Sequence, residues 1–141
     1  DRPGIGPLIS GSDGTGFELI AMSETHHVSL NGPAVFRWAT TTLGEVARRV
    51  CASAGIEPAD LDAVVLHQAN LRIINAIAKE LGAPNAVVAA DVVDTGNTSA
   101  ASIPLALTRL RREGKVAAGD LALTLAFGAG LTWAGAVIEV P

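Results

Sequence analysis

The stretch VVLHQANLRII, residues 64–74, changes from a strand pattern to a helix pattern. The continuous apolar run at 63–66 is typical of a strand that is covered on both faces. Apolar residues then recur at helical spacing over 71–81, and Gly82 is a natural C-terminal stop. The polar turn HQAN lies between the two patterns. A histidine with two amides at the end of a buried strand is an unusual choice if packing is its only purpose.

The rest of the sequence alternates between the same two patterns. Helical spacing predicts helices over 31–54 and 98–112, and apolar runs predict strands over 87–93, 121–127 and 131–140. The last two runs flank the letters GAG, so we expect them to pair as an antiparallel hairpin. Strands separated by helices indicate an α/β fold with a layered, mixed sheet of about five strands.

The composition predicts large buried contacts. Of the 141 residues, 49% are hydrophobic and only 17% are charged, which is apolar for a small domain. We therefore expect one face of the sheet to be apolar and to be covered only by a partner segment. The chain begins with Asp1 rather than Met, and the Gly- and Pro-rich segment 1–16 is expected to be a lead-in from a longer polypeptide.

Charge and cysteine content argue against several classes of protein. The net charge of -4 argues against nucleic-acid binding. No apolar run is long enough to span a membrane. The single cysteine, Cys51, excludes a disulfide framework and fits a reducing compartment, so we expect a cytoplasmic protein. Cys51 itself falls on an apolar helical stripe beside Val50, and we interpret it as a buried packing residue.

Three polar loops each follow a predicted strand: HQAN, DTGNTSAAS and FGAGLTW. Ligands of open α/β sheets bind at the carboxyl ends of the strands, so His67 and Asn97 are expected to face one crevice. A neutral imidazole offers one N–H and an amide offers two. Such converging neutral donors can stabilise an oxygen that becomes negative, such as that of a thioester enolate. The alternative is that His67 satisfies a backbone carbonyl and Asn97 shapes a turn.

The motifs HQANLRII, GNTSAAS and AFGAGLTWAGA, in this order and at this spacing, resemble the C-terminal half of β-ketoacyl-acyl-carrier-protein synthase III. The resemblance covers nearly the whole chain and implies half of a thiolase-like, layered αβαβα fold. Residues 1–16 would then lead in from a missing N-terminal half, and 17–141 would form the C-terminal half-domain. The implied reaction is a decarboxylating Claisen condensation that joins an acyl-CoA starter to malonyl-acyl-carrier protein in fatty-acid or polyketide initiation.

The resemblance also implies roles for individual residues. His67 and Asn97 match the decarboxylation pair, and Phe127 matches the aromatic residue between that pair and the nucleophile. The backbone N–H of Ala129 matches a donor to the acyl oxyanion. Coenzyme A thioester and phosphopantetheine are implied as substrates, without a further cofactor or a metal. The residues that match the pantetheine tunnel, each of which also has a plain packing interpretation, are Leu30, Gly32, Phe36, Ala69 and Asn70.

Cations define a candidate docking surface for the carrier protein. Arg72 matches the arginine that the family presents to its acidic carrier, and Lys79 lies on the same face of the predicted helix. Arg37, at the start of the earlier helix, is a further candidate. The alternative is that all three are ordinary solvated side chains. A homodimer of the complete enzyme is the implied assembly.

The nucleophile of the implied Cys-His-Asn triad is absent from this sequence. Cys51 lies inside a helical pattern, whereas the family's cysteine follows a strand, opens a helix and lies in the half that this chain lacks. Two alternatives therefore stay open beside condensation. One is an acyltransferase of the same fold that does not decarboxylate, and the other is a non-catalytic subunit that binds a carrier. The combination of HQAN and GNTS favours condensation, because both donors of the enolate hole are present.

Overall fold

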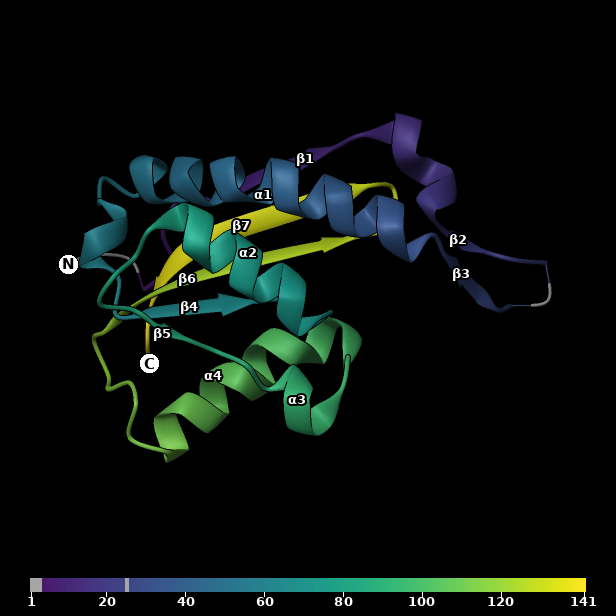
Figure 1. Ribbon diagram of the computed structural model, residues 1–141. Helices are drawn as coiled ribbons and strands as arrows, with labels where there is room; N and C mark the ends of the chain where they lie inside the picture. Colours follow the sequence, from purple (N-terminus) through teal and green to yellow (C-terminus); the bar gives the residue numbers. More distant parts are fainter. Residues whose placement is uncertain (1–3, 25) are drawn as a thin grey trace.

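The computed structural model describes residues 4–24 and 26–141; residues 1–3 of the expected lead-in lie outside the described residues. A mixed sheet forms the middle layer, with helices on both faces (Figure 1). Its five strands lie in the order β1-β7-β6-β4-β5, which confirms the expected mixed sheet. Strand β4 is parallel to β5 and β6, whereas β7 is antiparallel to β6 and β1. The strands are β1 (Ile9–Ser12), β4 (Ala63–Leu66), β5 (Val87–Val88), β6 (Leu121–Gly128) and β7 (Thr132–Glu139).

Helices α1 (Gly32–Ser53) and α2 (Leu71–Leu81) cover one face of the sheet (Figure 1). Both confirm the sequence prediction. Helix α1 begins at Asn31, whose side-chain oxygen accepts a hydrogen bond from the backbone N–H of Ala34. Helix α2 ends at Gly82, which has a left-handed backbone with φ of 71° and thus closes the helix as predicted. The buried stripes of the two helices and the strands form one core cluster.

The opposite face of the sheet carries helix α4 (Ser102–Arg112), which follows the 3-10 turn η3 (Ser99–Ala101). Ala106 and Leu110 of this helix pack into a second core cluster with Ala63 and Val65 of β4. The expectation of a sheet face covered only by a partner segment is therefore wrong. All four residues of β4 are buried, because the chain's own helices cover both faces.

The expected strand over 87–93 is too long. Pairing ends at β5, and the next residues form the one-turn helix α3 (Val92–Thr95). The cause lies outside the segment, because the side-chain oxygen of Gln68 accepts a hydrogen bond from the backbone N–H of Val92 (3.1 Å). This bond satisfies one of the free donors at the start of the turn.

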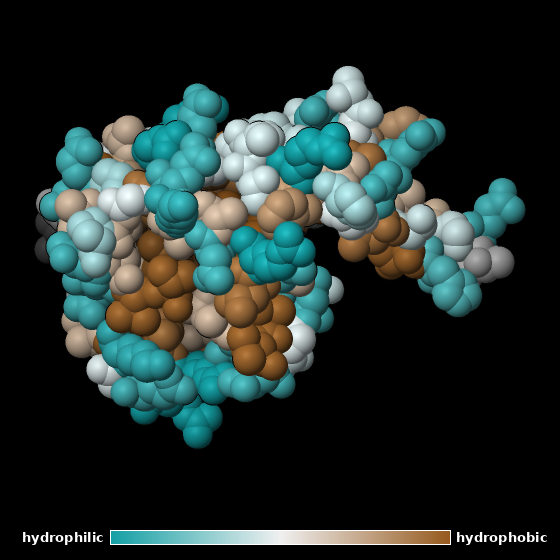
Figure 2. Space-filling model, viewed as in Figure 1, coloured by the Kyte–Doolittle hydropathy of each residue, from teal (hydrophilic) through white to brown (hydrophobic). Residues whose placement is uncertain are grey.

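Residues 4–16 take part in the fold. Strand β1 pairs with β7 over its whole length, so residues 9–12 form an edge of the sheet rather than only a connection. A 3-10 turn η1 (Gly14–Leu19) then leads to an antiparallel hairpin of β2 (Ile20–Met22) and β3 (Val28–Leu30). This β2–β3 arm projects from the body of the molecule and carries apolar surface (Figures 1 and 2). The remaining 3-10 turn is η2 (Pro58–Asp60).

Within residues 4–24 and 26–141, none of the helices combines the length and apolarity that crossing a membrane requires.

Candidate functional site

His67 follows strand β4 directly and is held from two sides. Its backbone N–H donates to the carbonyl of Leu125 in β6 (2.8 Å), which fixes the start of the HQAN turn. Its ring nitrogen Nδ1 lies 2.7 Å from the hydroxyl oxygen of Ser102, the first residue of α4. The ring is half-buried, and burial lowers its pKa below the usual value. This shift favours the neutral imidazole, the form that can donate without adding charge.

Asn97 lies in the loop between α3 and η3 and is exposed. Its side-chain oxygen Oδ1 accepts a hydrogen bond from the backbone N–H of Ser99 (2.9 Å), which stabilises a positive φ of 52° at Ser99. Because this bond uses the oxygen, the Nδ2 group with its two N–H donors is the end of the amide that can donate to a ligand. Asn97 therefore does shape a turn, as the alternative interpretation expected, but its donor end stays available.

An open hollow of about 460 Å³ lies in front of His67. Its lining combines His67 with Ser99 and Ala100 of η3, which follow Asn97 in the sequence, but Asn97 itself is not part of the lining. That His67 and Asn97 face one crevice stays a prediction. The Phe127 ring meets the His67 ring edge-on, with 5.8 Å between ring centres. The rest of the lining comes from the hairpin of β6 and β7: Ala126, Gly128, Thr132, Trp133 and Ala134.

Aromatic residues hold Phe127 in place from behind. The ring of Trp38, in α1, lies 5.9 Å from the ring of Phe127 and 5.9 Å from that of Trp133. Each such tilted pair contributes about 0.5–1.5 kcal/mol of stability beyond the contribution of its buried apolar area. The sequence patterns do not single out Trp38 or Trp133. Their only signal was residue type, since the contacts join α1 to two strands.

Ala129 lies in the turn between β6 and β7 and is exposed. Its backbone carbonyl accepts a hydrogen bond from the Thr132 hydroxyl (3.0 Å), which fixes the carbonyl side of the turn. Among the described residues, a positive φ outside glycine occurs only at His26 and Ser99. The methyl group of Ala129 therefore creates no backbone strain, and its N–H remains a candidate oxyanion donor.

The candidate tunnel residues do not line the hollow in front of His67. Leu30, at the end of β3, is 59% exposed, and a Cβ placed on Gly32 would meet open space. Asn70 is exposed and uses its side-chain oxygen to accept a hydrogen bond from the backbone N–H of Arg72 (2.8 Å), at the start of α2. Phe36 and Ala69 are half-buried. Their assignment to a pantetheine tunnel stays a prediction.

The candidate docking cations are all exposed. The guanidinium carbon of Arg72 lies 4.9 Å from the centre of the Phe36 ring, so a cation–π contact joins α2 to α1. This contact holds the charge of Arg72 in a defined position. Arg37 precedes Trp38 on α1, and Lys79 lies in the last turn of α2. Neither side chain takes part in an ion pair among the described residues.

Cys51 has the buried environment that was predicted. It is 1% exposed within the core cluster of α1, and burial raises the pKa of its thiol. A protonated, enclosed thiol is a poor nucleophile.

Gln68 and Ser102 were not recognised as site residues from sequence. Both are nearly fully buried, at 1% and 2% exposure. The Gln68 side chain donates to the carbonyls of Leu66 (2.7 Å) and Ala89 (3.3 Å) and accepts from Val92. Their burial gave no signal in the sequence, because Gln68 lies in the polar HQAN turn and Ser102 is the first residue of α4. Buried polar groups require partners, and only the structure shows these.

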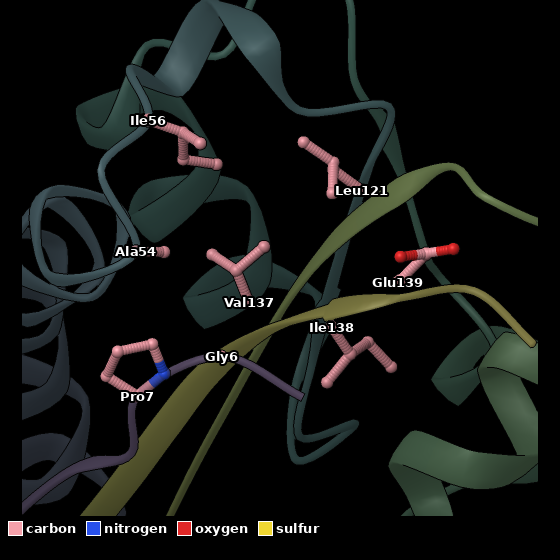
Figure 3. A pocket seen from close by; sticks show the side chains of 8 residues that line it. All are labelled: Gly6, Pro7, Ala54, Ile56, Leu121, Val137, Ile138 and Glu139. Carbon is pink, nitrogen blue, oxygen red and sulfur yellow. The ribbon is translucent and has the colours of Figure 1, made fainter. Parts of the chain in front are cut away.

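A second hollow, of about 190 Å³, lies at the opposite end of the sheet. Figure 3 shows Ile56, Leu121 and Val137 around it, with Glu139 at one side. Leu121 begins β6 and Val137 is near the end of β7, so this hollow lies away from His67. Its lining is largely apolar and offers no imidazole or amide side chain, so it lacks the neutral donors of the first site.

The fold and the His67 site together define a class: an α/β chain with a mixed sheet that presents a histidine at the carboxyl end of a buried strand. Residues 51–140 match the family described as 3-oxoacyl-[acyl-carrier-protein (ACP)] synthase III C terminal. This chain belongs to that family, which confirms the resemblance predicted from its three motifs.

Relatives are similar in sequence to this chain over nearly its whole length. It is 51% identical over 142 residues to a β-ketoacyl-[acyl-carrier-protein] synthase III of Streptomyces coelicolor, covering 100% of this chain and 45% of that protein. It is 45% identical over 151 residues to the mycobacterial β-ketoacyl-[acyl-carrier-protein] synthase III of Mycobacterium tuberculosis, covering 98% of this chain and 45% of that protein.

Solved structures show the same architecture. A priming β-ketosynthase from a polyketide biosynthetic pathway has a TM-score of 0.95 and 44% identity, covering 100% of this chain and 46% of that one. The 3-oxoacyl-[acyl-carrier-protein] synthase III of Aquifex aeolicus has a TM-score of 0.90 and 37% identity, covering 99% of this chain and 46% of that one. The chain thus has the fold of the C-terminal part of these thiolase-like enzymes and spans less than half of their length.

Proposed function

We propose that this chain is the C-terminal half of a decarboxylating condensing enzyme that joins an acyl-CoA starter to malonyl-acyl-carrier protein. One observation carries the proposal: the His67 ring, held by a buried hydroxyl, shares an open hollow with Phe127 and with Ser99 and Ala100, which follow Asn97. The site offers N–H donors, an aromatic ring and small residues, and its lining contains no charged side chain. Such a site suits a reaction in which a thioester oxygen gains negative charge.

The proposed reaction needs a cysteine thiolate from the N-terminal half, because Cys51 is buried. The thiolate attacks the acyl-CoA, and coenzyme A leaves with the electron pair of the broken C–S bond. Malonyl-carrier protein then loses carbon dioxide, and the electrons of the broken C–C bond form an enolate. The enolate oxygen accepts hydrogen bonds from His67 Nε2 and Asn97 Nδ2. The enolate carbon attacks the acyl-cysteine, whose oxygen accepts from the Ala129 N–H, and the thiolate is released.

The partners follow from this reaction. An acidic carrier protein would dock on the exposed cations Arg37, Arg72 and Lys79, and its phosphopantetheine arm would pass Leu30, Gly32, Phe36, Ala69 and Asn70. We further propose that the complete enzyme is a cytoplasmic homodimer. The similarity to β-ketoacyl-[acyl-carrier-protein] synthases supports a carrier protein as substrate.

Substitution of the two donors in the complete protein tests this proposal. His67→Ala or Asn97→Ala should slow the release of carbon dioxide from malonyl-carrier protein by about a hundredfold to a thousandfold. Acylation of the nucleophilic cysteine by acyl-CoA, followed by mass spectrometry, should remain because it precedes the enolate. His26→Ala and Asn85→Ala are matched controls, because both residues are exposed and neither lines the hollow.

Two results would contradict the assignment. Normal decarboxylation by either donor variant would remove that residue from the enolate hole. If the unsubstituted enzyme transfers its acyl group to a hydroxyl or amine and releases no carbon dioxide, the protein is an acyltransferase of the same fold.

A further inference from the structure

The hydroxyl of Ser102 has two polar neighbours in a place that water does not reach. It lies 2.7 Å from Nδ1 of His67, and it accepts a hydrogen bond from the backbone N–H of Gln68 (3.1 Å). Ser102 is 2% exposed at the first position of α4. One side chain of α4 therefore contacts both the His67 ring and the backbone of the HQAN turn. These two partners lie 35 and 34 positions earlier in the sequence.

The directions of these bonds can be worked out from the donors. The Gln68 N–H can only donate, so the Ser102 oxygen accepts there, and its own O–H proton needs an acceptor elsewhere. Among the described residues, its other hydrogen-bond contact is with His67 Nδ1 (2.7 Å), which can accept provided that this nitrogen carries no proton. If Nδ1 were protonated, the serine oxygen would accept two bonds and its buried O–H would lose its partner, which is unfavourable.

We propose that Ser102 is a positioning residue that holds neutral His67 in the tautomer with its proton on Nε2. The chain of donors runs from the Gln68 N–H to the Ser102 oxygen, and from the Ser102 O–H to His67 Nδ1. The Nε2–H is then the one donor that the ring can direct toward a ligand. The role in catalysis rests on the proposed function, whereas the tautomer is a property of the protein without substrate.

The surroundings of the ring support this reading. The other side chains that line the hollow beside His67 are uncharged, and Phe127 meets the ring edge-on rather than through a hydrogen bond. Thus no charged group of the lining competes with Ser102 for the choice of tautomer. The fixed partner on one ring nitrogen determines what the other nitrogen can do, as it does for histidines in other active sites.

The tautomer can be measured directly on the complete protein. We would label histidine with 15N and record the ring nitrogen signals by NMR, assigning those of His67 as the signals that disappear in His67→Ala. The expected result is a protonated Nε2 and an unprotonated Nδ1 in the unsubstituted protein. In Ser102→Ala, the Nδ1–H form should become populated. A protonated Nδ1 in the unsubstituted protein, or an unchanged tautomer in Ser102→Ala, would overturn the proposal.

The kinetic consequence is measured beside the spectrum. Ser102→Ala should lower kcat for decarboxylation of malonyl-carrier protein by about tenfold, with KM and cysteine acylation unchanged, because one net hydrogen bond is lost from the positioning of the ring. Ser102→Thr keeps the hydroxyl and should restore both the tautomer and the rate. Thr108→Ala is the control, since it removes a hydroxyl from the same helix at an exposed position.

The outcomes separate this proposal from the proposed function. If the tautomer changes in Ser102→Ala and decarboxylation keeps its normal rate, Ser102 has no positioning role and the proposal is wrong. If the unsubstituted enzyme does not decarboxylate at all, the proposed function fails, and the NMR signals still decide whether Ser102 holds the tautomer. Should Ser102→Ala fail to fold, Ser102→Cys, with its weaker donor, gives the same spectral test.

Discussion

Replacing the buried Gln68 by methionine should strongly destabilise the protein. Methionine has a similar length and no amide, so the change removes the hydrogen bonds to Leu66, Ala89 and Val92 while leaving most of the volume filled. These bonds join the HQAN turn to β4, to the residue after β5 and to the start of α3. The substitution therefore separates the His67 loop from the segment that leads to Asn97.

The size of the effect follows from the number and burial of these bonds. Each net hydrogen bond contributes about 1 kcal/mol, so three lost bonds lower the free energy of unfolding by about 3 kcal/mol. Gln68 is 1% exposed, so water cannot replace the lost partners. The matched control is Asn85→Ala, which removes one exposed hydrogen bond from the Asn85 side-chain amide to the Ala59 carbonyl (3.3 Å). Its effect should stay within about 0.5 kcal/mol.

Urea unfolding of the complete protein measures this free energy. The slope of the free energy against urea concentration should be the same for the variant and the unsubstituted protein. Hydrogen exchange supplies a local readout, because the Val92 amide should exchange faster once its acceptor is lost. A destabilisation by Gln68→Met no larger than that by Asn85→Ala, with normal protection of Val92, would refute the reasoning. It would show that the buried amide network does not hold the two loops together.

Two further predictions concern the surface and the thiol. Arg72→Glu should raise KM for malonyl-carrier protein by about tenfold while sparing acyl-CoA, because only the carrier presents an extended acidic surface. Added salt should also raise KM for malonyl-carrier protein in the unsubstituted enzyme, because it screens exposed charges. Arg49→Glu, which changes an exposed charge on α1, is the control. An equal loss of activity toward both substrates would contradict docking at Arg72. Cys51 should carry no acyl group after incubation with short acyl-CoAs at pH 7, because burial raises its pKa and keeps the thiol protonated. Peptide mass spectrometry checks this, and an acyl adduct on Cys51 would make the inert-thiol assignment wrong.

Local patterns were sufficient wherever neighbouring residues determine the structure. Strand β4 and helix α2 have the bounds predicted from apolar spacing and from Gly82. The hairpin of β6 and β7 is antiparallel as predicted. The family was recognisable for the same reason, because HQAN, GNTSAAS and FGAG are short segments whose order and spacing can be read directly. Periodicity and motif order depend on residues that are close in sequence.

Contacts between distant residues decided the rest. The segment 87–93, expected to be one strand, forms β5 and the start of helix α3. The side-chain oxygen of Gln68, 24 positions before Val92, accepts a hydrogen bond from the Val92 N–H at the start of that helix. The sheet face expected to be covered only by a partner segment is covered by α4, whose apolar stripe does not reveal which face it will meet. The partner of His67 is Ser102, 35 positions along the chain. The sequence predicted His67 as a donor, but the contact of its ring with a buried hydroxyl at 2.7 Å arises only from the packing of α4 against β4.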